Sequence, residues 1–151
     1  MDIVRFDRTR IPAAAEMFLK SFEPLCAQAP YLRPSMSLSH VEALLTMIMG
    51  QCEGVMAVEG NRLLGYMTWF INGSFRDGPK KGAYVPEWGH AADFERQRDV
   101  YQRLYKAATE IWFAESCEAH ALTLLANDTA MREWFFENGF GMLVVDAARD
   151  L

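Results

Sequence analysis

The sequence predicts a mixed α/β (α+β) domain whose helices cover both faces of a mostly antiparallel sheet with a parallel βαβ unit at its centre. Two observations carry this prediction. Residues 54–71 hold two apolar runs around a Gly60-Asn61 pair, which is typical of an antiparallel hairpin. Between residues 83 and 126 a strand-like run, a long amphipathic helix and a second apolar run follow one another, which is the order of a βαβ unit.

The bulk properties indicate one globular domain spanning residues 1–151, because a chain of this length can bury roughly 68–70% of its unfolded surface in a single core. The formal net charge of −5 argues against a nucleic-acid partner, since such proteins present a basic patch. The chain contains no uninterrupted run of eighteen apolar residues and does not begin with a secretory signal. We therefore expect a cytoplasmic protein that does not bind membranes.

The first part of the chain predicts a strand, two helices and the hairpin. Residues 2–7 alternate between apolar and polar, as in a strand, and residues 11–28 carry apolar side chains at helical spacing. Two prolines within residues 29–35 end this helix, and residues 37–52 form a second one. In the hairpin that follows, Glu59 should face Arg62 across the turn.

The second part begins with a strand over residues 83–88, and pairing should be interrupted at Pro86, which has no N–H to donate. Residues 94–117 predict a long helix. The continuous apolar run at residues 120–126 is typical of a strand buried on both faces.

The last part predicts a short helix and a final strand. The helix is capped by Asn127, Asp128 or Thr129 and stops at Gly139 in the left-handed conformation. Residues 140–147 then read as a last strand.

The cysteines and histidines predict no metal site. Cys117 and His120 have the spacing of half a site, but no second half appears, and the odd number of cysteines fits reduced thiols. His120, at the start of a buried strand, reads as a structural histidine.

An acidic protein that gathers arginines at the start of its long helix raises the question of an anion. Arg96, Arg98 and Arg103 oppose the helix dipole there. Free N–H groups and guanidinium groups at this position suit phosphates. The alternative is a solvated helix face on which Asp99 pairs with Arg103 at i, i+4.

A general base is suggested at the end of the strand that contains Pro86. Glu87 and His90 follow this strand, where ligands of α/β sheets tend to sit and where a base would meet a substrate amine. A loop residue of either type is more often only a hydrogen-bonded surface group. Tyr101 and Tyr105, one turn apart on the long helix, read either as core-edge residues or as neighbours of an acyl or phosphate group.

The order of these elements, the run "YVPEW" and the ending Gly139-Phe140 after a short aromatic helix resemble the GNAT superfamily of acyl-CoA-dependent N-acetyltransferases over essentially the whole chain. The resemblance implies that acetyl-CoA enters between two parallel strands, with its pantetheine along Tyr84, Val85, Pro86 and Glu87. It implies pyrophosphate at the start of the long helix, and a neutral amine that attacks the thioester carbonyl with Glu87 or His90 as base. The cofactor-binding set is therefore Tyr84, Val85, Pro86, Gln97, Arg98, Tyr101, Gln102, Arg103, Asn127 and Phe135.

Two positions depart from the family pattern. Where the helix start of the family carries small residues, this chain has Val100 or Tyr101, followed by Gln102 or Arg103. Where the family often has a tyrosine that protonates the leaving thiolate, it has Phe135. A positioned acid is worth about 10²–10⁴ in rate, so this loss predicts slower transfer or another acid.

We therefore expect an N-acyltransferase that uses acetyl-CoA on an amine of a small molecule or protein. The alternative is a non-catalytic GNAT-like module that binds CoA or a small molecule, such as one half of a tandem protein. A hydrolase is disfavoured because the chain has no G-x-S-x-G elbow. Exposed strand edges are compatible with a homodimer or with a second GNAT domain.

Overall fold

The computed structural model describes residues 1–29, 36–75 and 78–145 of the chain. Its helices are α1 (Ile11–Ala27), α2 (Leu38–Gln51), α3 (Gln97–Ala114) and α4 (Thr129–Glu137). Its strands are β1 (Asp2–Arg5), β2 (Gly54–Glu59), β3 (Arg62–Thr68), β4 (Phe70–Asn72), β5 (Gly82–Val85), β6 (His90–Ala92) and β7 (Ala119–Leu122). The mixed α+β class expected from the sequence is confirmed. Both prolines predicted to end the first helix, Pro30 and Pro34, lie outside the described residues.

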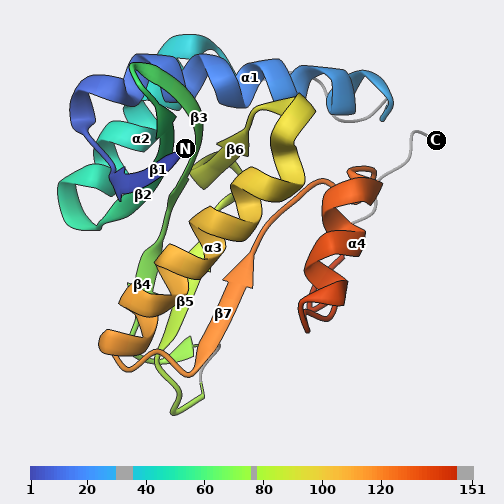
Figure 1. Cartoon of the computed structure of the whole chain (residues 1–151). Coiled ribbons are helices and arrows are strands. Elements are labelled where there is room, and N and C mark those ends of the chain that lie inside the picture. Colours follow the sequence, from blue (N-terminus) through green and yellow to red (C-terminus); the bar gives the residue numbers. More distant parts are fainter. Residues whose placement is uncertain (30–35, 76–77, 146–151) are drawn as a thin grey trace.

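The strands form two hydrogen-bonded sheets rather than one. The first has the order β1-β2-β3-β6 and is antiparallel, and the second has the order β4-β5-β7, with β5 and β7 parallel. Trp69, which is 2% exposed, separates β3 from β4 where the chain passes from one sheet to the other (Figure 1). The predicted hairpin thus continues into a third short strand.

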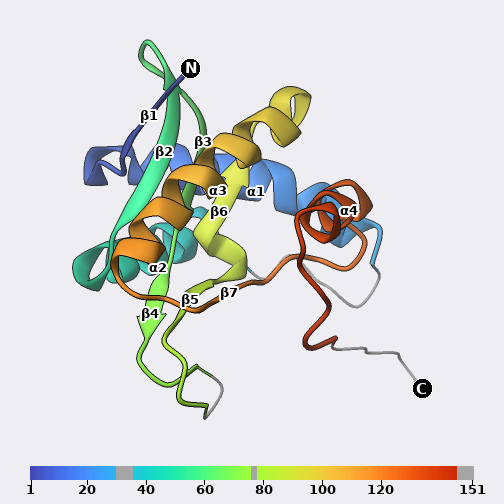
Figure 2. The ribbon, with the colours of Figure 1, turned by 60° about the horizontal axis from the view of Figure 1, so that its bottom comes forward.

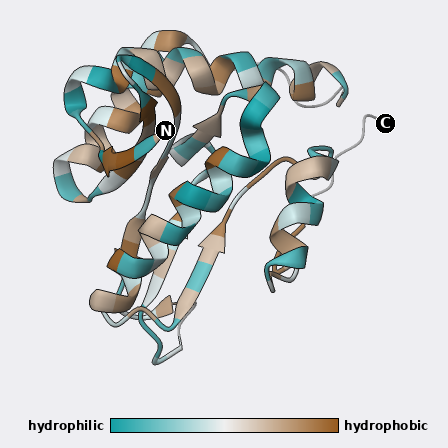
Figure 3. Ribbon diagram, viewed as in Figure 1, coloured by the Kyte–Doolittle hydropathy of each residue, from teal (hydrophilic) through white to brown (hydrophobic). Residues whose placement is uncertain are grey.

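Helices pack on both faces of this arrangement, as predicted. The long helix α3 contacts β2 and β3, with Val100, Leu104, Ala108 and Trp112 buried at i, i+4 spacing. Its polar residues are turned outward (Figure 3). On the opposite face, α1 and α2 enclose a second core cluster with β3 and β6. The sheet is therefore covered by two separate apolar layers.

The local signals at the turns and caps are confirmed. Gly60 has φ of 58°, and Glu59 pairs with Arg62 in the hairpin register. Asp128 is the N-cap of α4 and accepts a hydrogen bond of 3.2 Å from the backbone N–H of Met131, while Gly139 has φ of 86°. The start of α4 lies beside the end of α1 in both views of the ribbon (Figure 2).

Two predictions about strands are wrong, and one strand was missed. Residues 140–145 form no strand, and Met142 to Val145 are exposed. The remaining predicted strand residues, 146–147, lie outside the described part. The residues of β7 are half-buried rather than covered on both faces, because β7 pairs only with β5 within the described residues. The strand β6 was not predicted, since three residues are too short for a periodic signal.

Candidate active site

A cavity of about 790 Å³ opens between α1, β6, the start of α3 and the segment that follows β7. Its walls combine apolar side chains with several titratable groups. The residues that line it and enter the argument below are Glu16, Met17, Lys20, Leu25, Arg62, Glu87, His90, Asp93, Phe94, Glu95, Gln97, Tyr101, Leu124 and Asp128. The cavity thus lies beyond the carboxyl ends of the parallel strands β5 and β7, where α/β sheets tend to bind ligands.

The ladder between β5 and β7 ends at the cavity. The N–H of Thr123 donates a hydrogen bond of 3.0 Å to the carbonyl of Val85, and Pro86 follows with no N–H of its own. This confirms that pairing stops at Pro86. Up to Val85, β5 is flanked by β4 on one side and β7 on the other, so the backbone of Tyr84 lies inside the sheet.

Glu87 follows Pro86 directly and lines the cavity. Burial raises the pKa of its carboxyl, and no hydrogen bond or charge of another described residue opposes this rise. A cation that approaches a buried carboxylate of this kind stabilises its ionised form. Glu87 is therefore a half-buried carboxyl in the cavity wall with a raised pKa.

Glu87 begins a short turn of 3₁₀ helix, Glu87–Gly89, whose backbone is held against β3. Tyr66 donates a hydrogen bond of 2.8 Å to the carbonyl of Trp88, and Thr68 donates one of 3.2 Å to the carbonyl of Gly89. A Cβ on Gly89 would lie 2.7 Å from Cδ of Pro86 and 3.0 Å from the carbonyl oxygen of Thr68. Only glycine lets the turn close this tightly against β3.

His90 bridges from β6 to the end of β7. Its Nε2 lies 2.8 Å from the carbonyl oxygen of Thr123, which can only accept, so Nε2 carries the proton. Its Nδ1 is then the acceptor for the hydroxyl of Tyr101 at 2.6 Å. Burial lowers the pKa of His90, and the Thr123 carbonyl opposes this shift only in part. The ring is neutral, and its one lone pair is already engaged by Tyr101.

Tyr101 is 3% exposed and packs against Trp134 and Phe135 of α4. Burial raises the pKa of its hydroxyl well above the usual range, with the negative charge of Asp128 adding to the effect. Tyr101 is thus a buried core residue, as the first interpretation holds, and it also lines the cavity. Phe135 is 2% exposed and belongs to the same aromatic cluster.

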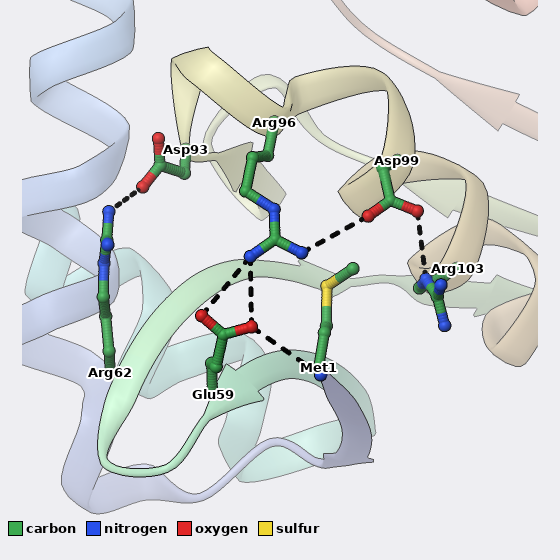
Figure 4. A network of polar contacts seen from close by, with 7 residues as sticks. All are labelled: Met1, Glu59, Arg62, Asp93, Arg96, Asp99 and Arg103. Atoms are coloured by element: carbon green, nitrogen blue, oxygen red, sulfur yellow. Dashed lines mark hydrogen bonds and ion pairs between the residues drawn. The ribbon is translucent and has the colours of Figure 1, made fainter.

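The arginines at the start of α3 pair with carboxylates. Arg96 contacts Glu59 and Asp99, and Arg103 Nε lies 3.0 Å from Asp99 (Figure 4). The predicted i, i+4 pair of Asp99 and Arg103 is thus confirmed. Arg98 lies 3.5 Å from Glu137 of α4, a contact that joins the two helices. All these side chains are largely exposed.

The remaining predicted residues are divided between the cavity and its surroundings. Gln97 lines the cavity, whereas Gln102 and Arg103 are exposed on α3 and do not. Asn127 donates a hydrogen bond of 2.8 Å to the carbonyl of Leu25, which ties the segment after β7 to α1. His120 is half-buried and lies 3.1 Å from the hydroxyl of Tyr105, as expected for a structural histidine.

Sequence reasoning missed the contribution of α1 to this site. Glu16 and Lys20 lie on the polar side of an amphipathic helix, and nothing in their spacing separates them from an ordinary solvated face. Asp128 was predicted as a helix cap, but its place in the cavity wall was not. The one sequence signal for this place was that the N-cap follows a strand predicted to be parallel, where ligands tend to bind.

Across residues 1–29, 36–75 and 78–145, no group of three or more His, Cys, Asp or Glu side chains is arranged to hold a metal ion. Within the same residues, none of the helices combines the length and the apolar character that a membrane crossing requires.

Comparison with known proteins was informative only at the level of structure. No family model matches the sequence, and no curated protein matches it either. The aminoglycoside N-acetyltransferase AAC(6')-Iy in complex with CoA superposes with a TM-score of 0.73 at 15% identity, over 99% of this chain and 93% of that one. The aminoglycoside acetyltransferase meta-AAC0020 from an uncultured soil metagenomic sample, in complex with sisomicin, gives 0.68 at 17%, over 99% and 95%.

A tetramutant of the BH1408 protein from Bacillus halodurans gives a TM-score of 0.78 at 13% identity, over the whole of both chains. At such identities the likeness concerns the fold alone. The order of elements, the parallel β5 and β7 and these superpositions agree, and the chain therefore has the fold of the GNAT acetyltransferases.

Proposed function

We propose that this protein is an N-acyltransferase that transfers the acetyl group of acetyl-CoA to a primary amine. The observation that carries the proposal is the half-buried carboxyl of Glu87, which has no ion-pair partner among the described residues, in a cavity at the ends of β5 and β7. The likeness to a CoA-bound and a sisomicin-bound acetyltransferase supports it. A solvent-exposed carboxyl would be a weaker base at neutral pH, so the burial of Glu87 suits the role.

The start of α3 suits the phosphates of the donor. A 3₁₀ turn, Phe94–Arg96, capped by the side chain of Asp93, leads directly into α3, and among the described residues no side chain caps α3 itself at Arg96. Gln97 lies in the cavity wall, and Arg98 is exposed one residue further on. The donor supplies an activated acyl group as a thioester, and these residues would hold its anionic part.

In the proposed reaction, Glu87 accepts a proton from the ammonium of the acceptor. The neutral amine then attacks the thioester carbonyl, so that the C–N bond forms as the C–S bond breaks. The sulfur leaves as a thiolate with an ordinary pKa near ~8.5, and water or the proton lost by the amide nitrogen can neutralise it. Phe135 has no hydroxyl for this step. The hydroxyl of Tyr101 is engaged by His90, and its raised pKa makes it a poor acid.

A second candidate is a GNAT-like module that binds a ligand without turnover. It is favoured by Tyr101, a large buried side chain at a position where a glycine would let backbone approach the phosphates. The experiment that separates the two is CoA release, measured by thiol detection with a panel of primary amines, alongside the thermal shift with acetyl-CoA. Ligand at about 100 times its Kd should stabilise the fold by roughly 2.7 kcal/mol.

For the enzyme, Glu87→Gln should lower kcat/KM by about 10²–10⁴ while binding of acetyl-CoA persists. Glu110→Gln, an exposed residue on α3, is the matched control. Binding of acetyl-CoA without release of CoA across the panel would favour the module. Absence of both binding and release would overturn the acetyltransferase and a module that binds acetyl-CoA.

A further inference from the structure

The cavity wall is strongly acidic. Among the residues that line it are five carboxylates, of Glu16, Glu87, Asp93, Glu95 and Asp128, and two side chains of permanent positive charge, Lys20 and Arg62. The positive charge of Arg62 is already balanced, because Arg62 forms an ion pair with Asp93 (Figure 4). The remaining four carboxylates face one ammonium group. The space between them therefore attracts cations.

These carboxylates differ in exposure, and the exposed pair, Glu16 and Glu95, is called the outer carboxylates below. Glu87 and Asp128 are half-buried, and burial raises the pKa of each. Glu16, from α1, and Glu95, from the segment before α3, are exposed. A ligand in the cavity would thus meet both half-buried and exposed negative charge.

Apolar surface lies between and beside these charges. Met17, Leu25 and Leu124 are half-buried in the wall, and Phe94, next to Glu95, is 83% exposed. An aromatic ring so exposed is unusual in a folded domain, and its face attracts ammonium groups. The combination of carboxylates, a free aromatic face and apolar wall matches a molecule that carries ammonium groups on a hydrocarbon or sugar frame.

We propose that the acceptor is a polycationic amine, with one ammonium group at Glu87 and at least one further ammonium group at the outer carboxylates Glu16 and Glu95. This inference rests on the proposed function for the reacting amine, but the recognition of the cation can be measured without it. The inner ammonium offsets the burial of the Glu87 carboxylate, and the outer one fixes which nitrogen reaches Glu87.

The test compares spermidine with butylamine, first by equilibrium binding to the protein alone and then as acceptors with acetyl-CoA. Spermidine should bind at least about tenfold more tightly at low ionic strength, and the advantage should shrink at about 0.5 M salt. The double variant Glu16→Gln/Glu95→Gln should lose most of this advantage. Glu110→Gln/Glu133→Gln, which removes the same charge from exposed helix positions outside the cavity wall, should retain it.

Equal affinities for spermidine and butylamine would overturn the proposal. An equal loss of the spermidine advantage in the two double variants would also overturn it, since the preference would then come only from the net charge of the protein. If butylamine is acetylated as efficiently as spermidine, the proposed substrate class is wrong while the proposed acyltransferase activity stands. If spermidine binds at the outer carboxylates but no amine releases CoA, the proposed reaction fails while the polycation site stands.

Discussion

The hydroxyl of Tyr101 on α3 donates a hydrogen bond of 2.6 Å to Nδ1 of His90 on β6, and both residues are buried. Through Nε2, His90 continues this chain to the carbonyl of Thr123 at the end of β7. Three elements that are far apart in the sequence are thereby tied together beside the cavity. The histidine that sequence analysis placed next to Glu87 as a candidate base thus has a clear structural role.

Tyr101→Phe should destabilise the protein, because it leaves Nδ1 of His90 buried without a donor. Such an orphaned acceptor costs about 1–3 kcal/mol in the free energy of unfolding, equivalent to a few °C in Tm. Tyr84→Phe provides the comparison, since it removes a bond of 2.9 Å to Oγ1 of Thr123 that is only half-buried. Urea denaturation of both variants should give the larger loss for Tyr101→Phe, and the reverse order would contradict the assigned network.

His90 should make the protein less stable as pH falls. Burial holds its pKa in the folded state below the ordinary value of 6.5, so the unfolded chain binds more protons in the window between the two pKa values. The free energy of unfolding therefore declines as pH drops below about 6.5 and is unaffected by this group above it. Glu87 and Asp128 act in the opposite direction, since the folded state raises the pKa of both.

The contribution of His90 is isolated by comparing wild type with His90→Gln at pH 7.5 and pH 5.0, values that lie about one unit or more to either side of an ordinary histidine pKa. The variant is less stable at both, but it should lose less on acidification. A wild type and a variant with the same pH dependence would show that His90 is not held neutral.

The sequence was sufficient for the elements whose signals are local. The cap Asp128, the left-handed Gly139 and the Gly60 turn are each dictated by backbone geometry that few residues satisfy. The stop at Pro86 follows from a missing N–H. These points fixed the order of elements, and with it the place where β5 and β7 end.

The cavity itself was only half predictable. Glu87 follows its strand directly and was found, but Glu16 reaches the same space from a helix about seventy positions earlier, so only tertiary packing brings the two together. The final strand failed for a related reason. Met142 to Val145 have strand-like composition, yet a strand also needs a neighbour, and residues 140–145 pair with none of the described strands.

Two glycines should respond in opposite ways to alanine. Gly89→Ala should destabilise the protein by about 1–3 kcal/mol, because the new Cβ overlaps the ring of Pro86 and the backbone of Thr68. Gly50→Ala lies in α2 with nothing within 4 Å and should stabilise it by up to about 1 kcal/mol. The free energies of unfolding of the two variants test this, and a neutral Gly89→Ala would show that the turn before β6 can relax.

The arginines at the start of α3 should contribute to CoA binding. Arg98 and Arg103 pair with exposed carboxylates, Glu137 and Asp99, and such pairs are readily exchanged for phosphate. Arg98→Gln should raise the Kd for CoA by about tenfold at low salt. Arg5→Gln, which removes a charge from β1 outside the cavity wall, should leave it unchanged. An unaltered Kd in Arg98→Gln and Arg103→Gln would assign these arginines to the helix face alone.

The pH profile of acetyl transfer should show Glu87 directly. The carboxyl must be ionised to accept the proton of the amine, and burial raises its pKa above the ordinary 4.5, so kcat/KM should fall as pH drops through this raised value. Binding of a cationic acceptor opposes the shift, because the ammonium stabilises the carboxylate, so the acid limb of kcat should lie at lower pH than that of kcat/KM. Steady-state rates measured over the same range for Glu87→Gln should lack this limb. A limb that persists in the variant would assign the proton transfer to another group, such as Asp128, which is also a half-buried carboxyl of the wall.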